Sequence, residues 1–151
     1  MVSARATAAA VRDPELPVVT IEELGILRDV TERDGRVTVT ITPTYSGCPA
    51  MDVIRADITA ALHADGYRDV EVATSLAEPW TTDWITPAGQ AKLQRAGIAP
   101  PAKKTVLTLT VRCPRCGSPD TQELSRFGAT ACKALWRCRA CREPFERVKA
   151  I

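Results

Sequence analysis

The chain has 151 residues, which is enough for one medium domain or for one small domain with an appendage. Its 45% hydrophobic content suits a globular core, and its formal charge of +2 does not by itself indicate a nucleic-acid partner. The charge is uneven, because residues 1–112 carry 12 Lys and Arg against 14 Asp and Glu, whereas residues 113–151 carry 8 against 4. No apolar run approaches the length of a membrane span, and we also expect no signal peptide, since the N-terminal residues lack a long apolar segment.

The first predicted elements are a helix and a β-hairpin. Residues 4–12 are rich in alanine and permit a helix, which the following Asp-Pro pair ends because a residue before proline avoids the helical region. Residues 13–25, with two prolines and a final glycine, predict a turn and then a short helix. Strands are predicted at residues 26–31 and, where apolar and polar residues alternate, at 36–43; the Asp-Gly pair between them is typical of a hairpin turn.

A helix and a third strand complete the predicted N-terminal domain. Apolar residues recur at helical spacing between residues 50 and 62, and Gly66 is a good helix stop. Residues 68–76 predict a third strand. The order of helix, β-hairpin, helix and strand predicts a small α+β domain over residues 8–78.

Residues 79–104 are predicted to connect this domain to a second one. A Thr-Pro pair at 86–87 is typical of a helix start and Gly97 of a helix end, so the connection contains a short helix. An alternating strand over residues 105–111 then opens the second domain, which covers residues 105–151.

The sequence offers little support for a catalytic site. The only histidine, His63, falls on the exposed side of the predicted helix, so a histidine-dependent triad is poorly supported. The chain has no P-loop, no GxGxxG and no HExxH motif. Trp80 and Trp84 are interpreted as core residues, with a docking patch as the alternative. We therefore predict that the chain is not itself an enzyme.

The strongest functional signal is a set of four cysteines near the C-terminus. Two Cys-x-x-Cys turns each direct two sulfurs at one point; they contain Cys113, Cys116, Cys138 and Cys141. Four thiolates form a closed tetrahedral site that zinc prefers and that iron can also occupy. We predict one structural zinc per chain in a zinc ribbon, because so short a domain needs a bound metal ion to stabilise its fold. The alternatives are a rubredoxin-like iron site and a set that binds no metal.

The two remaining cysteines are isolated. Paired ligands with no disulfide pattern indicate a reducing compartment, so we predict a cytoplasmic protein. Cys132 is interpreted as a free thiol packed near the ribbon; the other interpretation is an alternative metal ligand or a second reactive thiol exposed beside the metal. Three arginines interleave with the second pair and form either a partner-docking surface or a solvated face; they are Arg137, Arg139 and Arg142.

Cys48 is the other isolated cysteine, and it lies between a predicted strand and a predicted helix. Its position before Pro49 places the thiol at a predicted helix N-cap, where the helix dipole and free N–H groups favour a thiolate. Such a thiolate suits a metal ligand or a nucleophile. The alternative is a small buried residue that only packs at the turn.

Acidic and hydroxyl side chains are candidates to support Cys48. Asp13 and Glu15 lie in a loop that is expected to fold back toward the same end of the sheet, and a carboxylate near a thiolate suits iron better than it suits a nucleophile. The alternative is that these carboxylates are caps and surface charges. Neighbouring hydroxyl groups are expected to order the loop without doing chemistry; they belong to Thr42, Thr44, Tyr45 and Ser46.

These motifs together resemble a known family over nearly the whole chain. The chain is similar to the D subunit of the ring 1,2-phenylacetyl-CoA epoxidase system, PaaD, also called PaaJ. The similarity lies in the segments DPELPVVTIEELGILRDV, TPTYSGCPAM, WTTDWIT, GIAPP and CPRCGS with FGATACKALWRCRACREPF. Residues 8–78 alone resemble the wider SufT-like family of iron–sulfur assembly domains. That family pairs an Asp-Pro-Glu element, here residues 13–15, with a Cys-Pro loop, here residues 48–49.

The resemblance implies an accessory role in aerobic phenylacetate breakdown. It implies that the chain is not the di-iron oxygenase component but matures or loads an iron or iron–sulfur centre on an oxygenase or reductase partner. Cys48 then becomes a transient metal or cluster ligand. One such thiolate cannot complete a cluster, so a homodimer or a ligand from the client would be needed.

Three other functions stay open at this stage. The chain could be a docking subunit whose zinc ribbon is purely structural. It could be an electron carrier with iron in the ribbon. A nucleic-acid-binding ribbon is less supported, because the sequence lacks the dense basic and aromatic surface expected of one.

Overall fold

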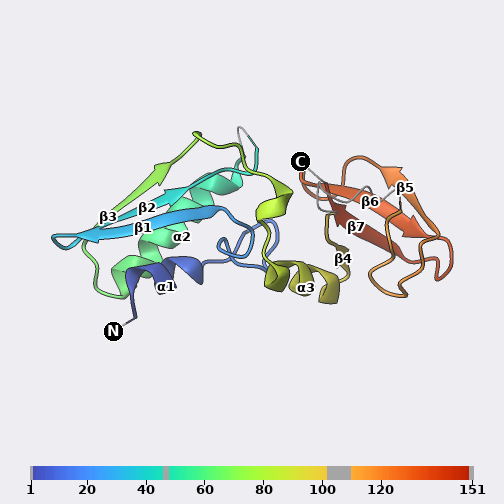
Figure 1. The fold of residues 1–151 in the computed structure, drawn as a ribbon, viewed down its shortest axis with the longest axis horizontal. Coiled ribbons are helices and arrows are strands. Elements are labelled where there is room, and N and C mark those ends of the chain that lie inside the picture. Colours follow the sequence, from blue (N-terminus) through green and yellow to red (C-terminus); the bar gives the residue numbers. More distant parts are fainter. Residues whose placement is uncertain (1, 46–47, 102–109, 150–151) are drawn as a thin grey trace. The chain divides into compact units, whose positions relative to one another are not determined.

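The computed structural model describes residues 2–45, 48–101 and 110–149 (Figure 1). The chain divides into two compact units, Met1–Thr86 and Pro87–Ile151, and each is described by itself. The domain limits expected from the sequence stay predictions.

The first unit is a three-stranded sheet with two helices on one of its faces (Figure 1). The order in the sheet is β1-β2-β3; β1 and β2 are antiparallel, whereas β2 and β3 are parallel. The elements in chain order are α1 (Ala4–Ala9), β1 (Leu27–Arg33), β2 (Arg36–Ile41), α2 (Ala50–Ala64) and β3 (Asp69–Thr74). The predicted order of helix, β-hairpin, helix and strand is therefore confirmed.

The core of the first unit follows the two periodicities seen in the sequence. In β2 the buried side chains alternate, at Val37, Val39 and Ile41, so one face of the sheet is apolar. On α2 the buried side chains recur at helical spacing; they are Ala50, Met51, Ile54, Ile58 and Leu62. His63 is exposed, as its spacing predicts.

The hairpin between β1 and β2 has the turn that its sequence predicts. Asp34 and Gly35 both have positive φ, of 51° and 80°. Two successive residues with positive φ match the right-handed twist of the flanking strands, which is why Asp-Gly is common at this place. The turn therefore fixes the register in which Arg33 pairs with Arg36.

The short helix predicted within residues 13–25 is wrong: this segment forms turns and one isolated bridge. Thr20 and Glu23 exchange reciprocal bonds, since the Glu23 carboxylate accepts from the Thr20 amide at 2.9 Å and the Thr20 hydroxyl accepts from the Glu23 amide at 3.2 Å. This capping box begins a helical turn. Gly25, with φ of 76°, ends it at once, so no helix propagates.

The last residues of the first unit pack against the segment around Gly25. Trp80 is buried and its indole N–H donates to the Leu24 carbonyl at 2.8 Å, which confirms its interpretation as a core residue. Trp84 is half-buried, and the Arg28 guanidinium lies 3.7 Å from its ring centroid. A Cβ on Gly25 would lie 2.6 Å from the Trp84 Cβ. Gly25 is thus required both by its φ and by this close approach.

We expect Gly25→Ala to lower the free energy of unfolding of the first unit by roughly 2 to 4 kcal/mol, because strain and overpacking add. Urea unfolding followed by tryptophan fluorescence measures the change. The control is Gly66→Ala, which has φ of 96° but open space around the new Cβ, so only strain is added there. Equal losses at the two positions would contradict the role given to the Trp84 contact.

The second unit begins with a helix and continues as a four-stranded sheet in the order β4-β7-β6-β5 (Figure 1). The strands β5, β6 and β7 form antiparallel pairs, and β4 runs parallel to β7. The elements are α3 (Pro87–Arg95), β4 (Ile98–Ala99), β5 (Thr121–Ser125), β6 (Lys133–Cys138) and β7 (Pro144–Val148). The predicted helix between Pro87 and Gly97 is confirmed.

Two strands of the second unit require comment: the strand predicted at residues 105–111 and the strand β4. Most of the strand predicted at residues 105–111 lies outside the described residues, and Val111, which is described, is not in a strand. The short strand β4, within the expected connecting segment, was not predicted. A strand of two residues is too short to show an alternation of apolar and polar side chains. It is therefore recognised only from its pairing with Glu146 and Arg147.

Candidate metal centre and the Cys48 loop

The second unit brings four cysteine sulfurs to one point. The four Sγ atoms lie within 4.8 Å of one another. Cys113 and Cys141 are separated by 3.8 Å, and Cys116 and Cys138 by 3.5 Å, between sulfurs. Four sulfurs at the usual zinc–sulfur distance of about 2.3 Å around a tetrahedral ion are about 3.8 Å apart. The spacing of the four sulfurs is therefore close to that of a tetrahedral metal site.

Backbone hydrogen bonds hold each cysteine pair in its turn. The Cys113 amide donates to the Ser118 carbonyl at 2.9 Å, and the Gly117 amide donates to the Cys113 carbonyl at 2.9 Å. The Cys138 amide donates to the Glu143 carbonyl at 3.0 Å. The turns thus orient the sulfurs through the main chain, as a metal knuckle requires.

The sulfur set is also part of the small core of the second unit. Cys113 and Cys138 are fully buried and pack with Ala99 and Phe145, while Cys116 is exposed. A core of this size buries little apolar surface, so a metal ion on these sulfurs would contribute much of the folding free energy. Four sulfurs leave no open coordination position, so the arrangement suits structure rather than catalysis.

The thiol protons of the set differ in acidity. The Cys141 amide, 3.5 Å from the Cys138 Sγ, is the main cause that lowers the pKa of Cys138 to about 7. The Glu143 amide lowers the pKa of Cys141, but desolvation and the three neighbouring thiols raise it to about 12. Crowding therefore opposes the ionisation of Cys141, and a divalent cation at the centre of the set would remove this opposition.

We expect Cys116→Ser to lose the bound metal and to unfold the second unit while the first unit stays folded, because each unit has its own core. Metal analysis after dialysis and two-dimensional amide NMR measure both effects. The control is Cys132→Ser, since the Cys132 sulfur is not a member of the set of four. Retention of a full equivalent of metal in Cys116→Ser would contradict the assignment.

Cys132 and Arg139 have local partners in the second unit. The Cys132 sulfur is half-buried and lies 3.0 Å from the Thr130 hydroxyl. Arg139 pairs with Asp120 at 3.7 Å, with both side chains exposed, and Arg137 is exposed. The contribution of an exposed pair of this kind is small.

Cys48 lies at the edge of the first unit's sheet. Because β2 and β3 are parallel and α2 connects them, the loop before α2 emerges where both strands end. The Ser75 amide donates to the Ile41 carbonyl at 2.8 Å, which places the end of β3 beside the end of β2. The Cys48 side chain is half-buried at this edge.

The predicted N-cap position of Cys48 is wrong by one residue. Pro49 is the N-cap of α2, with φ of −67° and ψ of −21°, and Cys48 precedes it. The helical backbone of Pro49 starts the first turn early, and the Met51 amide donates to the Cys48 carbonyl at 3.2 Å. The thiol still lies within one residue of the helix N-terminus, where the dipole favours negative charge.

The carboxylates expected near Cys48 have structural contacts of their own. Asp13 is buried, and its Oδ1 accepts from the Glu15 and Leu16 amides, both at 2.8 Å. This is an Asx turn, so Asp13 has the capping role that was the alternative interpretation. Glu15 and Thr44 are half-buried. A place for Asp13, Glu15 or Thr44 beside the thiol stays a prediction.

Sequence reasoning missed Arg55 as a candidate at this edge. Arg55, on α2, donates to the hydroxyl of Thr74, the last residue of β3. Its Nε is buried and has no hydrogen-bond partner within the described part of the chain. A signal was available, because Arg55 follows Cys48 by seven residues and a helical side chain at this spacing lies on the same face and leans toward the N-terminus.

Comparisons with known proteins agree with the two units. Residues 5–74 match the family described as iron–sulfur cluster assembly protein, and residues 98–149 match the family described as PaaD zinc beta ribbon domain. The chain is thus an α+β iron–sulfur-assembly-type domain followed by a zinc-ribbon domain, and the fold class predicted from the sequence is confirmed.

A curated relative spans most of the chain. This relative, the D subunit of a "Putative 1,2-phenylacetyl-CoA epoxidase" of Escherichia coli, is 47% identical over 142 residues, which cover 92% of this chain and 86% of the relative. The chain therefore belongs to the PaaD family of phenylacetyl-CoA epoxidase subunits, as its motifs indicated.

Two further similarities concern the N-terminal part. The "Fe-S protein maturation auxiliary factor" of Porphyromonas gingivalis is 33% identical and covers 55% of this chain and 80% of the relative. A crystal structure of a domain of unknown function, DUF59, from Bacillus anthracis is 30% identical and covers 60% of this chain and 87% of that chain, with a TM-score of 0.55. Within the described residues, no helix is long and apolar enough to cross a membrane.

Proposed function

We propose that this chain is an accessory factor of a phenylacetyl-CoA epoxidase system that loads iron or an iron–sulfur cluster onto a partner protein, with Cys48 as the transient ligand. The observation that carries the proposal is the separation of two kinds of thiol. Four sulfurs converge in the second unit, whereas the Cys48 thiol lies outside that set, at the sheet edge of an iron–sulfur-assembly-type domain. The names of the relatives, a subunit of that system and a maturation factor, support the same role.

The surroundings of Cys48 suit a ligand that must release its cargo. Its side chain is half-buried, so a client can approach it. Cys48 lies next to the N-terminus of α2, a helix of 15 residues, and both this helix end and the Arg55 guanidinium at the same edge favour an anionic cargo. One thiolate holds iron weakly, which favours transfer over storage.

Hand-over by this route is a ligand exchange. The bond between iron and the Cys48 sulfur breaks as a bond between iron and a client thiolate forms, and the proton of the client thiol passes to Cys48. No electron is transferred. A second Cys48 in a homodimer, or the client itself, supplies the remaining ligands.

The four-sulfur set takes the structural role in this proposal. Zinc fits its donor type, its sulfur spacing and its closed geometry, and it has no redox chemistry that would compete with the iron cargo. We therefore assign one zinc per chain to Cys113, Cys116, Cys138 and Cys141.

We expect the wild-type chain to retain zinc and labile iron after anaerobic reconstitution with iron and sulfide, and Cys48→Ser to retain zinc alone. Serine keeps the size of the side chain but is a poor soft ligand. Metal and acid-labile sulfide analysis measures both, with Cys132→Ser as the matched thiol control. The same iron content in wild type and Cys48→Ser would remove Cys48 from the proposal.

We further expect Arg55→Gln to lower the iron retained after reconstitution by less than Cys48→Ser does. Glutamine keeps a donor for Thr74 but removes the positive charge. Arg68→Gln, at an exposed site outside α2, is the control for charge alone. Iron content unchanged by Arg55→Gln, or lowered equally by both glutamine substitutions, would exclude a specific role for Arg55.

A further inference from the structure

The two units have opposite charge. Residues 1–86 carry 7 Lys and Arg against 14 Asp and Glu, a formal balance of −7, whereas residues 87–151 carry 13 against 4, a balance of +9. Four thiolates on a divalent ion would reduce the second balance only to +7. The near-neutral charge of the whole chain thus conceals a strongly basic second unit, which indicates an acidic partner.

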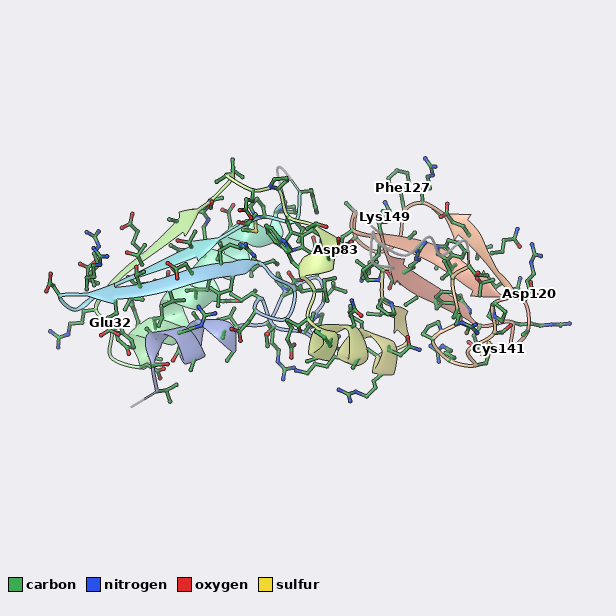
Figure 2. All side chains as sticks on the ribbon, viewed as in Figure 1. Glu32, Asp83, Asp120, Phe127, Cys141 and Lys149 are labelled. Atoms are coloured by element: carbon green, nitrogen blue, oxygen red, sulfur yellow. The ribbon has the colours of Figure 1, made fainter. Side chains whose placement is uncertain are left out.

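A groove on the ribbon combines this charge with exposed apolar surface. It has a volume of about 420 Å³ and is lined by Glu123, Arg126, Phe127, Ala134 and Lys149. Phe127 is 72% exposed, and the Lys149 ammonium lies 4.8 Å from its ring centroid, as Figure 2 shows for these two side chains. We call this the Phe127 groove. An exposed aromatic ring among cations is typical of a recognition surface rather than of a solvated face.

Two buried donors lie on the strands beneath the Phe127 groove. Ala134 pairs with Arg147 across β6 and β7, and Trp136 lies on the same face of β6 as Ala134. Trp136 Nε1 and Arg147 Nε are both buried and have no hydrogen-bond partner among the residues that the structure describes, and the Arg147 guanidinium lies 5.6 Å from the Trp136 ring. Burial lowers the pKa of Arg147, and Glu123 opposes this only in part. Groups of this kind are costly unless an acceptor reaches them.

We propose that the Phe127 groove binds an acidic segment of a partner protein. An apolar side chain of the segment packs on Phe127, and its carboxylates pair with Arg126 and Lys149. This surface is on the second unit and does not depend on any role of Cys48.

A polypeptide fits this surface better than a nucleic acid does. Glu123 lines the groove, and its carboxylate can accept from backbone N–H groups, which a polypeptide offers and a phosphodiester backbone does not. Among the described residues, Phe127 is a single exposed aromatic ring, which is less than the row of stacking platforms that single strands use.

The test uses the full-length, zinc-loaded chain and a short synthetic peptide of Asp and Glu with one central leucine. Fluorescence anisotropy of the labelled peptide at low ionic strength measures affinity, and two-dimensional NMR follows the Trp136 indole N–H. We expect binding that weakens with salt, a shift of the Trp136 indole resonance, and a loss of affinity of roughly tenfold for Arg126→Glu and for Phe127→Ala.

The matched control is Arg137→Glu, which makes the same charge change at an exposed position on the opposite face of β6. We expect it to weaken binding much less than Arg126→Glu. Equal weakening by Arg126→Glu and Arg137→Glu would overturn the proposal, because binding would then follow net charge alone. Tighter binding of single- or double-stranded DNA than of the peptide would also overturn the proposal. The same holds for self-association through the groove, which sedimentation would show as an oligomer that dissociates in Arg126→Glu.

Discussion

The parallel pairing of β2 with β3 is the constraint on which the arrangement of the first unit depends. Parallel neighbours cannot be joined by a tight turn, so the chain must cross from one end of the sheet to the other, and α2 makes this crossing. The loop that leads into α2 therefore emerges at the edge where both strands end. Cys48 is in that loop, next to the helix N-terminus, because of the topology and not because of any local motif alone.

The second unit has a different constraint. Its core is small, and two of its fully buried side chains are cysteines of the four-sulfur set. A metal ion on these sulfurs would therefore couple its binding to the folding of this unit. The two proposed roles follow from this difference. The closed set in the second unit stabilises a fold, whereas the single thiol of the first unit has no structural role and can exchange its ligand.

The charge distribution gives the two units distinct partners in this account. The acidic first unit presents Cys48 at its sheet edge, and the basic second unit presents the Phe127 groove. A factor that loads a metal centre must recognise its client as well as hold the cargo, and separate surfaces allow both at once. Tethering two weak contacts in one chain raises their combined affinity without a tighter bond to the metal.

Much of this was predictable from the sequence where the signal is local. The alternation in β2, the helical spacing in α2, the Asp-Gly turn and the spacing of the Cys-x-x-Cys pairs each have a short-range cause, and the structure agrees with each. The sequence predictions failed where contacts between distant segments determine the local structure. The segment before β1 has a capping box but stops after one turn at Gly25, which packs against Trp84, and Arg55 becomes a candidate only when Thr74 is brought beside α2.

X-ray absorption of the anaerobically reconstituted chain, at the iron and zinc edges, tests the central claim most directly. The account predicts sulfur neighbours around iron in the wild type, no cysteine sulfur around any residual iron in Cys48→Ser, and four sulfurs around zinc in both proteins. An iron edge that is the same in wild type and Cys48→Ser, or iron in place of zinc among the four sulfurs, would contradict it.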